Sequence, residues 1–99
     1  MLYKDKNKDI KDRVKNLLEQ MTVEEKAYQL TSIWSYEITK RDFTFDVEKL
    51  KSKFPHGLGQ ITRIGGGTPT KVKDIPKFRN AIQEYFMNNT RLGIPVMFH

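Results

Sequence analysis

The segment from residue 57 to residue 99 limits the fold more than any other part of the chain, because two strand-like runs flank a helix-like one. Residues 94–98 are short and continuously apolar, which is typical of a strand covered on both faces in a parallel sheet. Gly93, just before them, suits the left-handed backbone that closes a helix. Residues 58–64 have the composition of another strand. We therefore predict a parallel βαβ unit with a right-handed crossover, and an α/β fold class.

The helix of this unit is expected over residues 74–89. Asp74 and Pro76 are typical of a helix start, since proline in the first turn gives up an amide hydrogen that has no partner there. Apolar residues at helical spacing then form one stripe: Ile75, Phe78, Ile82, Tyr85 and Phe86.

The first 56 residues indicate a helical segment. An amphipathic helix is predicted over residues 9–21, with an apolar face that needs a partner. Thr22 and Glu25 have the spacing of a capping box, which predicts a second helix over residues 23–31. Asp46 is a candidate N-cap for a short helix. Residues 32–44 show no sustained period and are expected to form a loop or an insertion. The chain is thus predicted to be one domain in two parts, a helical segment at residues 1–56 and the βαβ unit at residues 57–99.

Composition narrows the class of function. The net charge is +6, but the basic residues are interrupted by acidic ones and are not interleaved with aromatic residues, so no nucleic-acid partner is expected. No apolar run is long enough for a membrane span, and no signal peptide is visible, so a cytoplasmic location without a membrane partner is expected. The chain has no cysteine, which excludes disulfides and thiolate metal ligands.

In parallel α/β folds the chemistry lies beyond the carboxyl ends of the strands. Arg63 and His99 occupy these positions in the two predicted strands, and the Gly65, Gly66, Gly67 loop follows the first. None of the twelve carboxylates falls at a predicted strand end, so no catalytic pair is expected. His56 and His99 lack a metal-ligand spacing, and we expect neither a metal nor a cofactor. Trp34 is expected in the core rather than on a sugar-binding surface.

Three segments of the chain resemble glycoside hydrolase family 3, most closely its β-glucosidase and β-xylosidase members. The first is the string D-R-V-x-x-L-L-x-x-M-T-x-E-E-K-x-x-Q-L at residues 12–30. The others are G-L-G-Q-I-T-R at residues 57–63, which resembles the first barrel strand of the family, and T-R-L-G-I-P-V-M-F-H at residues 90–99. The order and spacing of the three segments also match.

The resemblance implies the N-terminal part of a (β/α)8 TIM-type barrel, comprising N-terminal helices and one βαβ unit. Such enzymes remove terminal β-linked glucose or xylose with retention, without a cofactor. Their nucleophile and acid/base come later than the matched segments, so no catalytic residue is expected in this chain. The partners implied are a β-linked oligosaccharide or glycoside, the remaining barrel and a second domain.

Arg63 and His99 are the residues expected near the sugar, with Gly65, Gly66 and Gly67 at the rim of its pocket. The alternative is a stand-alone small basic α/β binding or interaction module without catalysis. Coding sequence that continues past His99 through an acidic residue would favour the enzyme.

Overall fold

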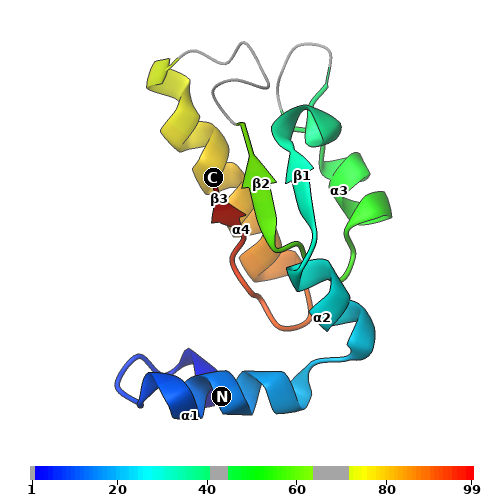
Figure 1. The fold of residues 1–99 in the computed structure, drawn as a ribbon. Helices are drawn as coiled ribbons and strands as arrows, with labels where there is room; N and C mark the ends of the chain where they lie inside the picture. The colour runs from blue at the N-terminus through cyan, green and yellow to red at the C-terminus, as the bar shows by residue number, and fades with distance from the viewer. Residues whose placement is uncertain (1, 41–44, 64–71) are drawn as a thin grey trace.

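The computed structural model describes residues 2–40, 45–63 and 72–99 (Figure 1). The order of its helices and strands along the chain is η1 (Leu2–Lys4), α1 (Ile10–Gln20), α2 (Val23–Gln29), β1 (Ser32–Trp34), η2 (Ser35–Ile38), α3 (Val47–Lys53), β2 (Gln60–Thr62), η3 (Val72–Asp74), α4 (Ile75–Asn89) and β3 (Met97–Phe98).

The three strands form one parallel sheet in the order β1-β2-β3 (Figure 1). The predicted βαβ unit is confirmed as β2-α4-β3, so the α/β class is correct. The loop expected over residues 32–44 is wrong in its first part, because Ser32–Trp34 is a strand that pairs with β2. Three residues are too few to show a period-2 alternation, so no pattern in the sequence indicated this strand.

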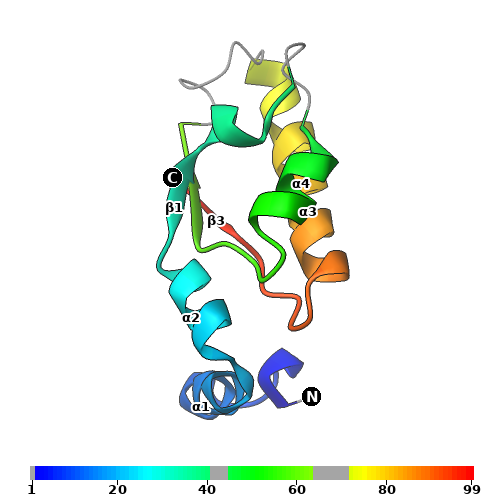
Figure 2. The same ribbon diagram turned by 90° about the vertical axis from the view of Figure 1, so that its right-hand side faces the viewer.

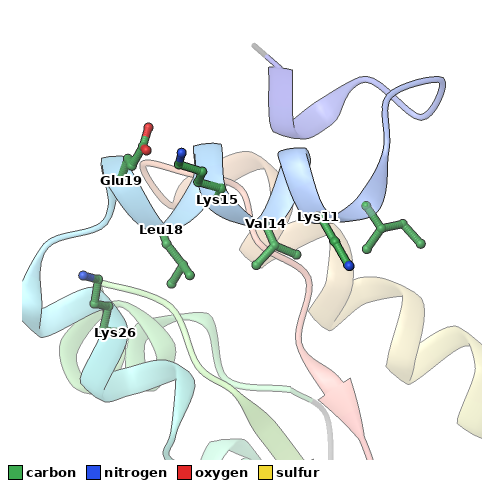
Figure 3. A pocket seen from close by; sticks show the side chains of 7 residues that line it. Lys11, Val14, Lys15, Leu18, Glu19 and Lys26 are labelled. Carbon is green, nitrogen blue, oxygen red and sulfur yellow. The ribbon is translucent and has the colours of Figure 1, made fainter.

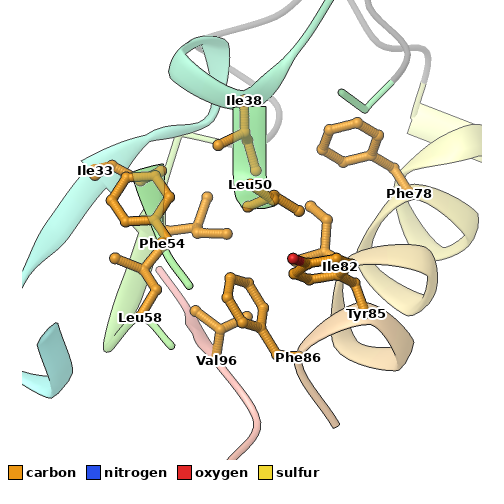
Figure 4. Close-up of a cluster of buried hydrophobic side chains, with 11 residues drawn as sticks. Ile33, Ile38, Leu50, Phe54, Leu58, Phe78, Ile82, Tyr85, Phe86 and Val96 are labelled. Carbon is orange, nitrogen blue, oxygen red and sulfur yellow. The ribbon is translucent and has the colours of Figure 1, made fainter. Parts of the chain in front are cut away.

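Both crossover helices lie on the same side of the sheet (Figure 2). Helix α3 connects β1 to β2, and α4 connects β2 to β3. Their apolar side chains and those of one sheet face form a single core (Figure 4). Among its buried members are Ile33, Leu50, Ile61, Ile82 and Phe86. The core therefore lies between the sheet and the α3–α4 layer.

The opposite face of the sheet, here called the bare face, has no helix over it among the described residues (Figure 2). Trp34 and Met97 on this face are 49% and 61% exposed. Within the described residues, residues 94–98 are covered on one face only, whereas their apolar run predicted cover on both. Val96 is buried and Phe98 half-buried, while Met97 between them faces solvent. The strand itself is also shorter than expected.

The predicted helix starts are confirmed. The Thr22 hydroxyl accepts from the Glu25 amide at 3.1 Å, and the Glu25 carboxylate accepts from the Thr22 amide at 2.9 Å, which completes the capping box. The Asp46 carboxylate caps α3. Helix α4 starts with proline in its first turn and ends at Asn89. Gly93 has the expected positive φ, 63°, although Gly93 follows the helix by several residues. Local signals were sufficient for these elements.

Helix α1 lies beyond the amino ends of the strands (Figure 1). Residues 2–25, here called the N-terminal arm, are attached to the segment that follows α4 by two groups of polar contacts. The Arg91 guanidinium donates to both oxygens of the Glu25 carboxylate at 2.7 Å and to the carbonyl of Gln20 at 2.6 Å. The Tyr3 hydroxyl donates to the Leu92 carbonyl at 2.8 Å. The arm is thus held by directional polar contacts and not by a buried face of α1, in which no residue is buried.

Candidate functional site

The carboxyl ends of all three strands meet at one edge of the sheet, here called the carboxyl edge. Trp34 ends β1, and Arg63 and His99 directly follow β2 and β3. The amide of Arg63 donates to the carbonyl of His99 at 3.1 Å, and the hydroxyl of Ser35 donates to the carbonyl of Arg63 at 2.9 Å. Residues from three distant parts of the sequence are therefore held together by one backbone hydrogen bond and one hydrogen bond from a side chain.

Arg63 has an unusual backbone conformation, with a φ of 61°. Few residues other than glycine adopt this left-handed region, so the surrounding hydrogen bonds must hold it. Its guanidinium lies 5.0 Å from the centre of the Trp34 ring, within the range of a cation–π contact. This conformation turns the chain out of β2 and places the Arg63 side chain against β1.

A pocket of about 410 Å³ lies beside Trp34, on the bare face and at the carboxyl edge. Its lining comes from β1, β2 and η2: Ser32, Ile33, Trp34, Tyr36, Glu37 and Thr62. The Trp34 and Tyr36 rings meet edge to face with 5.4 Å between their centres, and each residue is about half exposed. The pocket is open to solvent, and it combines two aromatic side chains with hydroxyl and carboxylate groups.

Glu37 is the site residue that sequence reasoning missed. It lies three residues after β1, and its carboxylate accepts from the Trp34 amide at 3.0 Å. The statement that no carboxylate lies at a strand end concerned the two predicted strands only, and Glu37 follows β1, which was not among them. Within the described ranges Glu37 is the only carboxylate among the residues that line this pocket.

The structure brings Arg63 and His99 together, as their positions after two adjacent parallel strands suggested. Gly65, Gly66 and Gly67 lie outside the described residues. The core position expected for Trp34 is wrong, because the indole is half exposed and belongs to the pocket. The large apolar surface of tryptophan favoured a core position. Trp34 instead occupies an outward-facing position of β1, which leaves it exposed.

A second pocket, of about 570 Å³, lies against helix α1 (Figure 3). Ile10, Val14 and Leu18 form its apolar part, and they are 71%, 50% and 48% exposed. Lys11, Lys15, Glu19 and Lys26 form its polar part. In Figure 3 the Val14 and Leu18 side chains point away from α1 into open space. This is the apolar face that was expected to need a partner.

Two kinds of feature are absent from the described ranges. No group of three or more histidine, aspartate or glutamate side chains is arranged to hold a metal ion there. No helix in those ranges has the length and apolarity needed to cross a membrane.

The fold and the carboxyl edge define a small α/β protein with a three-stranded parallel sheet, helices on one sheet face and a pocket at the strand ends. The chain matches no model of a known protein family, and no curated protein matches it.

Proposed function

We propose that this chain forms the first strands and helices of a (β/α)8-type barrel in a retaining β-glycosidase, and that the carboxyl edge contributes to its sugar site. The observation that carries the proposal is the winding of the sheet. Its strands follow in the order β1-β2-β3, and both crossover helices cover the same face. In a doubly wound fold the strand order reverses and helices cover both faces, whereas a barrel is wound in one direction with all helices outside.

The bare face supports the same proposal. In a barrel this face lines the interior, where side chains from alternate strand positions pack against those of the remaining strands. Trp34, Thr62 and Met97 would then point inward, and the carboxyl edge would form part of the active-site mouth. The resemblance to glycoside hydrolase family 3 supplies the reaction, hydrolysis of terminal β-linked glucose or xylose. By the family resemblance, residues 57–63 would contain the first barrel strand. In the structure these residues contain β2, and β1 precedes it in the sheet.

A second candidate is the stand-alone binding module, and one observation favours it. The outer edges of the sheet carry side-chain caps. Glu37 accepts from the Trp34 amide on β1, and the Gln83 side chain both donates to and accepts from the backbone of Val96 beside β3, at 2.6 and 2.9 Å. Such caps protect open sheet edges in proteins that do not extend the sheet. Both candidates place ligand binding at the carboxyl edge, and they differ in catalysis.

Hydrolysis tests the glycosidase. The protein that carries this chain is assayed with p-nitrophenyl β-glucoside and β-xyloside, and NMR follows the anomeric configuration of the first product. We expect turnover with retention, and no turnover by the 99-residue chain alone, since a glycosidase needs two carboxyl groups about 5–10 Å apart. The absence of hydrolysis in the carrying protein would overturn the glycosidase and leave the binding module.

Arg63→Ala sharpens this test. If Arg63 acts at the sugar site, its loss lowers kcat/KM much more than it lowers the Tm. Arg79→Ala is the matched control, because the Arg79 guanidinium stacks in the same way over Phe98, at 4.8 Å from the ring centre. Equal effects of the two variants would show that Arg63 is a stabilising surface residue only.

A further inference from the structure

We propose that the pocket beside Trp34 is a pyranose-binding subsite, in which the indole packs against the sugar ring and the Glu37 carboxylate accepts its hydroxyl groups. This inference deepens the glycosidase function and rests on it for the choice of β-glycosides as ligands. It adds a site and two binding residues on β1 and η2, outside the segments that carry the family resemblance from residue 57 onward.

The Trp34 ring provides the apolar half of the recognition. The C–H groups on one face of a β-pyranose carry partial positive charge and pack against the negatively polarised face of an aromatic ring. Trp34 is 49% exposed, and Tyr36 meets it edge to face. A volume of about 410 Å³ lies within the range of small-ligand pockets.

Glu37 provides the polar half. One carboxylate oxygen, Oε2, accepts from the Trp34 amide at 3.0 Å, and this bond fixes the carboxylate beside the ring. Within the described residues no hydrogen bond engages the second oxygen, Oε1. A carboxylate oxygen accepts only, so it selects donors such as sugar hydroxyls. The Thr62 hydroxyl lines the same pocket and already donates to the Ile33 carbonyl, which leaves it as an acceptor.

The charges around the pocket favour a neutral ligand. The Glu37 carboxylate opposes phosphate and carboxylate ligands, which are anions. The Arg63 guanidinium, 5.0 Å from the Trp34 ring centre, opposes a cation on the same ring. A polyhydroxylated ring without charge satisfies both groups, and a β-glucoside or β-xyloside has this chemistry.

Arg63 acts here as a positioning residue. It does not line the pocket, so its guanidinium holds the indole from outside. The Ser35 hydroxyl, bonded to the Arg63 carbonyl at 2.9 Å, connects the end of β2 to the segment that carries Tyr36 and Glu37. The orientation of the ring therefore depends on Arg63 and Ser35 together.

Intrinsic fluorescence tests the subsite directly, because Trp34 is the only tryptophan in the chain. The 99-residue chain is titrated with methyl β-glucopyranoside and methyl β-xylopyranoside, and with mannitol as an acyclic polyol control. We expect a saturable fluorescence change with at least one glycoside and none with mannitol. No saturable change with either glycoside, in a chain whose circular dichroism shows the helices intact, would overturn the subsite.

Two variants identify the residues. Glu37→Gln keeps an oxygen acceptor for the Trp34 amide and so preserves the fold, and we expect about tenfold weaker binding from the loss of a charged acceptor. Glu24→Gln, an exposed carboxylate of α2, is the matched control with unchanged affinity. Trp34→Phe keeps an aromatic side chain in the pocket. We expect this variant to bind the glycoside more weakly, and saturation-transfer NMR measures its binding. Equal affinity of Glu37→Gln and the parent chain would contradict the role of Glu37.

The two proposals fail in different ways. Glycoside binding that depends on Glu37, without hydrolysis by the carrying protein, would keep the subsite and exclude the glycosidase. Hydrolysis with KM unaffected by Glu37→Gln would keep the glycosidase and exclude the subsite.

Discussion

At the scale of single residues, Glu25 connects the local structure of α2 to a distant part of the chain. Its carboxylate closes the capping box with Thr22 and accepts two hydrogen bonds from Arg91, and Glu25 is only 5% exposed. The hydrogen bonds from Arg91 lower the pKa of Glu25 below its ordinary value of 4.5, and the Thr22 amide acts in the same direction, against the effect of burial. The charged form is thus favoured in the folded protein.

This shift predicts acid sensitivity. Because the folded-state pKa of Glu25 is lowered, its contribution to stability is fully present above pH 4.5 and is lost as the pH falls through the folded-state value. Glu25→Gln should therefore lower the free energy of unfolding at neutral pH, and its difference from the parent chain should shrink in acid. Urea unfolding followed by circular dichroism measures both, with the exposed Glu24→Gln as control. A difference that stays constant with pH would show that the charge of Glu25 does not matter.

The other half of the capping box gives a prediction of its own. Thr22→Ala removes the acceptor of the Glu25 amide and should cost about 1 kcal/mol, within the range of about 0.5–2 kcal/mol for a lost N-cap. Thr22→Ser keeps the hydroxyl and should restore most of the loss. The comparison is made by thermal unfolding. An unchanged Tm for Thr22→Ala would mean that the start of α2 is held by Arg91 alone.

At the scale of elements, the approach of α2 to β2 depends on Gly59. A Cβ at this position would lie 1.9 Å from the carbonyl oxygen of Gln29, whereas a Cβ at Gly57 meets only a side-chain atom at 3.5 Å. Gly59 also donates to the Tyr28 carbonyl and accepts from the Met97 amide, both at 2.9 Å. It therefore joins α2, β2 and β3 at one point.

These contacts distinguish two glycine substitutions. Gly59→Ala should cost about 2–3 kcal/mol, because backbone must move away from backbone. Gly57→Ala should cost about 1–2 kcal/mol, since only its positive φ of 103° is strained. Urea unfolding of the two variants gives the comparison. A smaller loss for Gly59→Ala than for Gly57→Ala would contradict the close approach of α2 to β2.

The elements also show what the sequence could predict. Helices α1 to α4 follow from local signals, namely apolar spacing and caps such as Asp46, and all start within one or two residues of the expected positions. Strand β1 carries no such signal, because only Ile33 of its three residues is buried. Missing β1 also meant missing Glu37 and misplacing Trp34. The positions of Arg63 and His99 at strand ends were predicted because both residues follow strands with recognisable apolar residues.

At the scale of the whole molecule, large apolar side chains remain exposed within the described ranges. They include the α1 stripe of Ile10, Val14 and Leu18, and also Trp34 and Met97 on the bare face. Contiguous exposed apolar patches above a few hundred Å² are uncommon in soluble monomers. The sheet edges are less available, because Glu37 and Gln83 cap backbone groups of Trp34 and Val96 there.

We therefore expect the 99-residue chain to self-associate through its faces. Size-exclusion chromatography with light scattering at micromolar concentration should show species larger than a monomer. Leu18→Lys, in the centre of the α1 stripe, should shift the population towards monomer. Leu30→Lys, which changes an apolar residue that is 90% exposed and lies outside the α1 pocket, is the control and should not. A compact monomer for the parent chain would favour the stand-alone module.

The parallel pairing of the sheet has a consequence for biosynthesis. The side-chain contacts between β1 and β2 and between β2 and β3 join residues 29 and 37 positions apart, and Tyr3 finds its partner Leu92 only 89 positions later. A helix lies between each strand and the neighbour that follows it along the chain, so each pairing joins segments that are distant in sequence and must close a long loop. During synthesis, the polar contacts of Tyr3, Gln20 and Glu25 can therefore form only after the segment that contains Arg91 and Leu92 has been made.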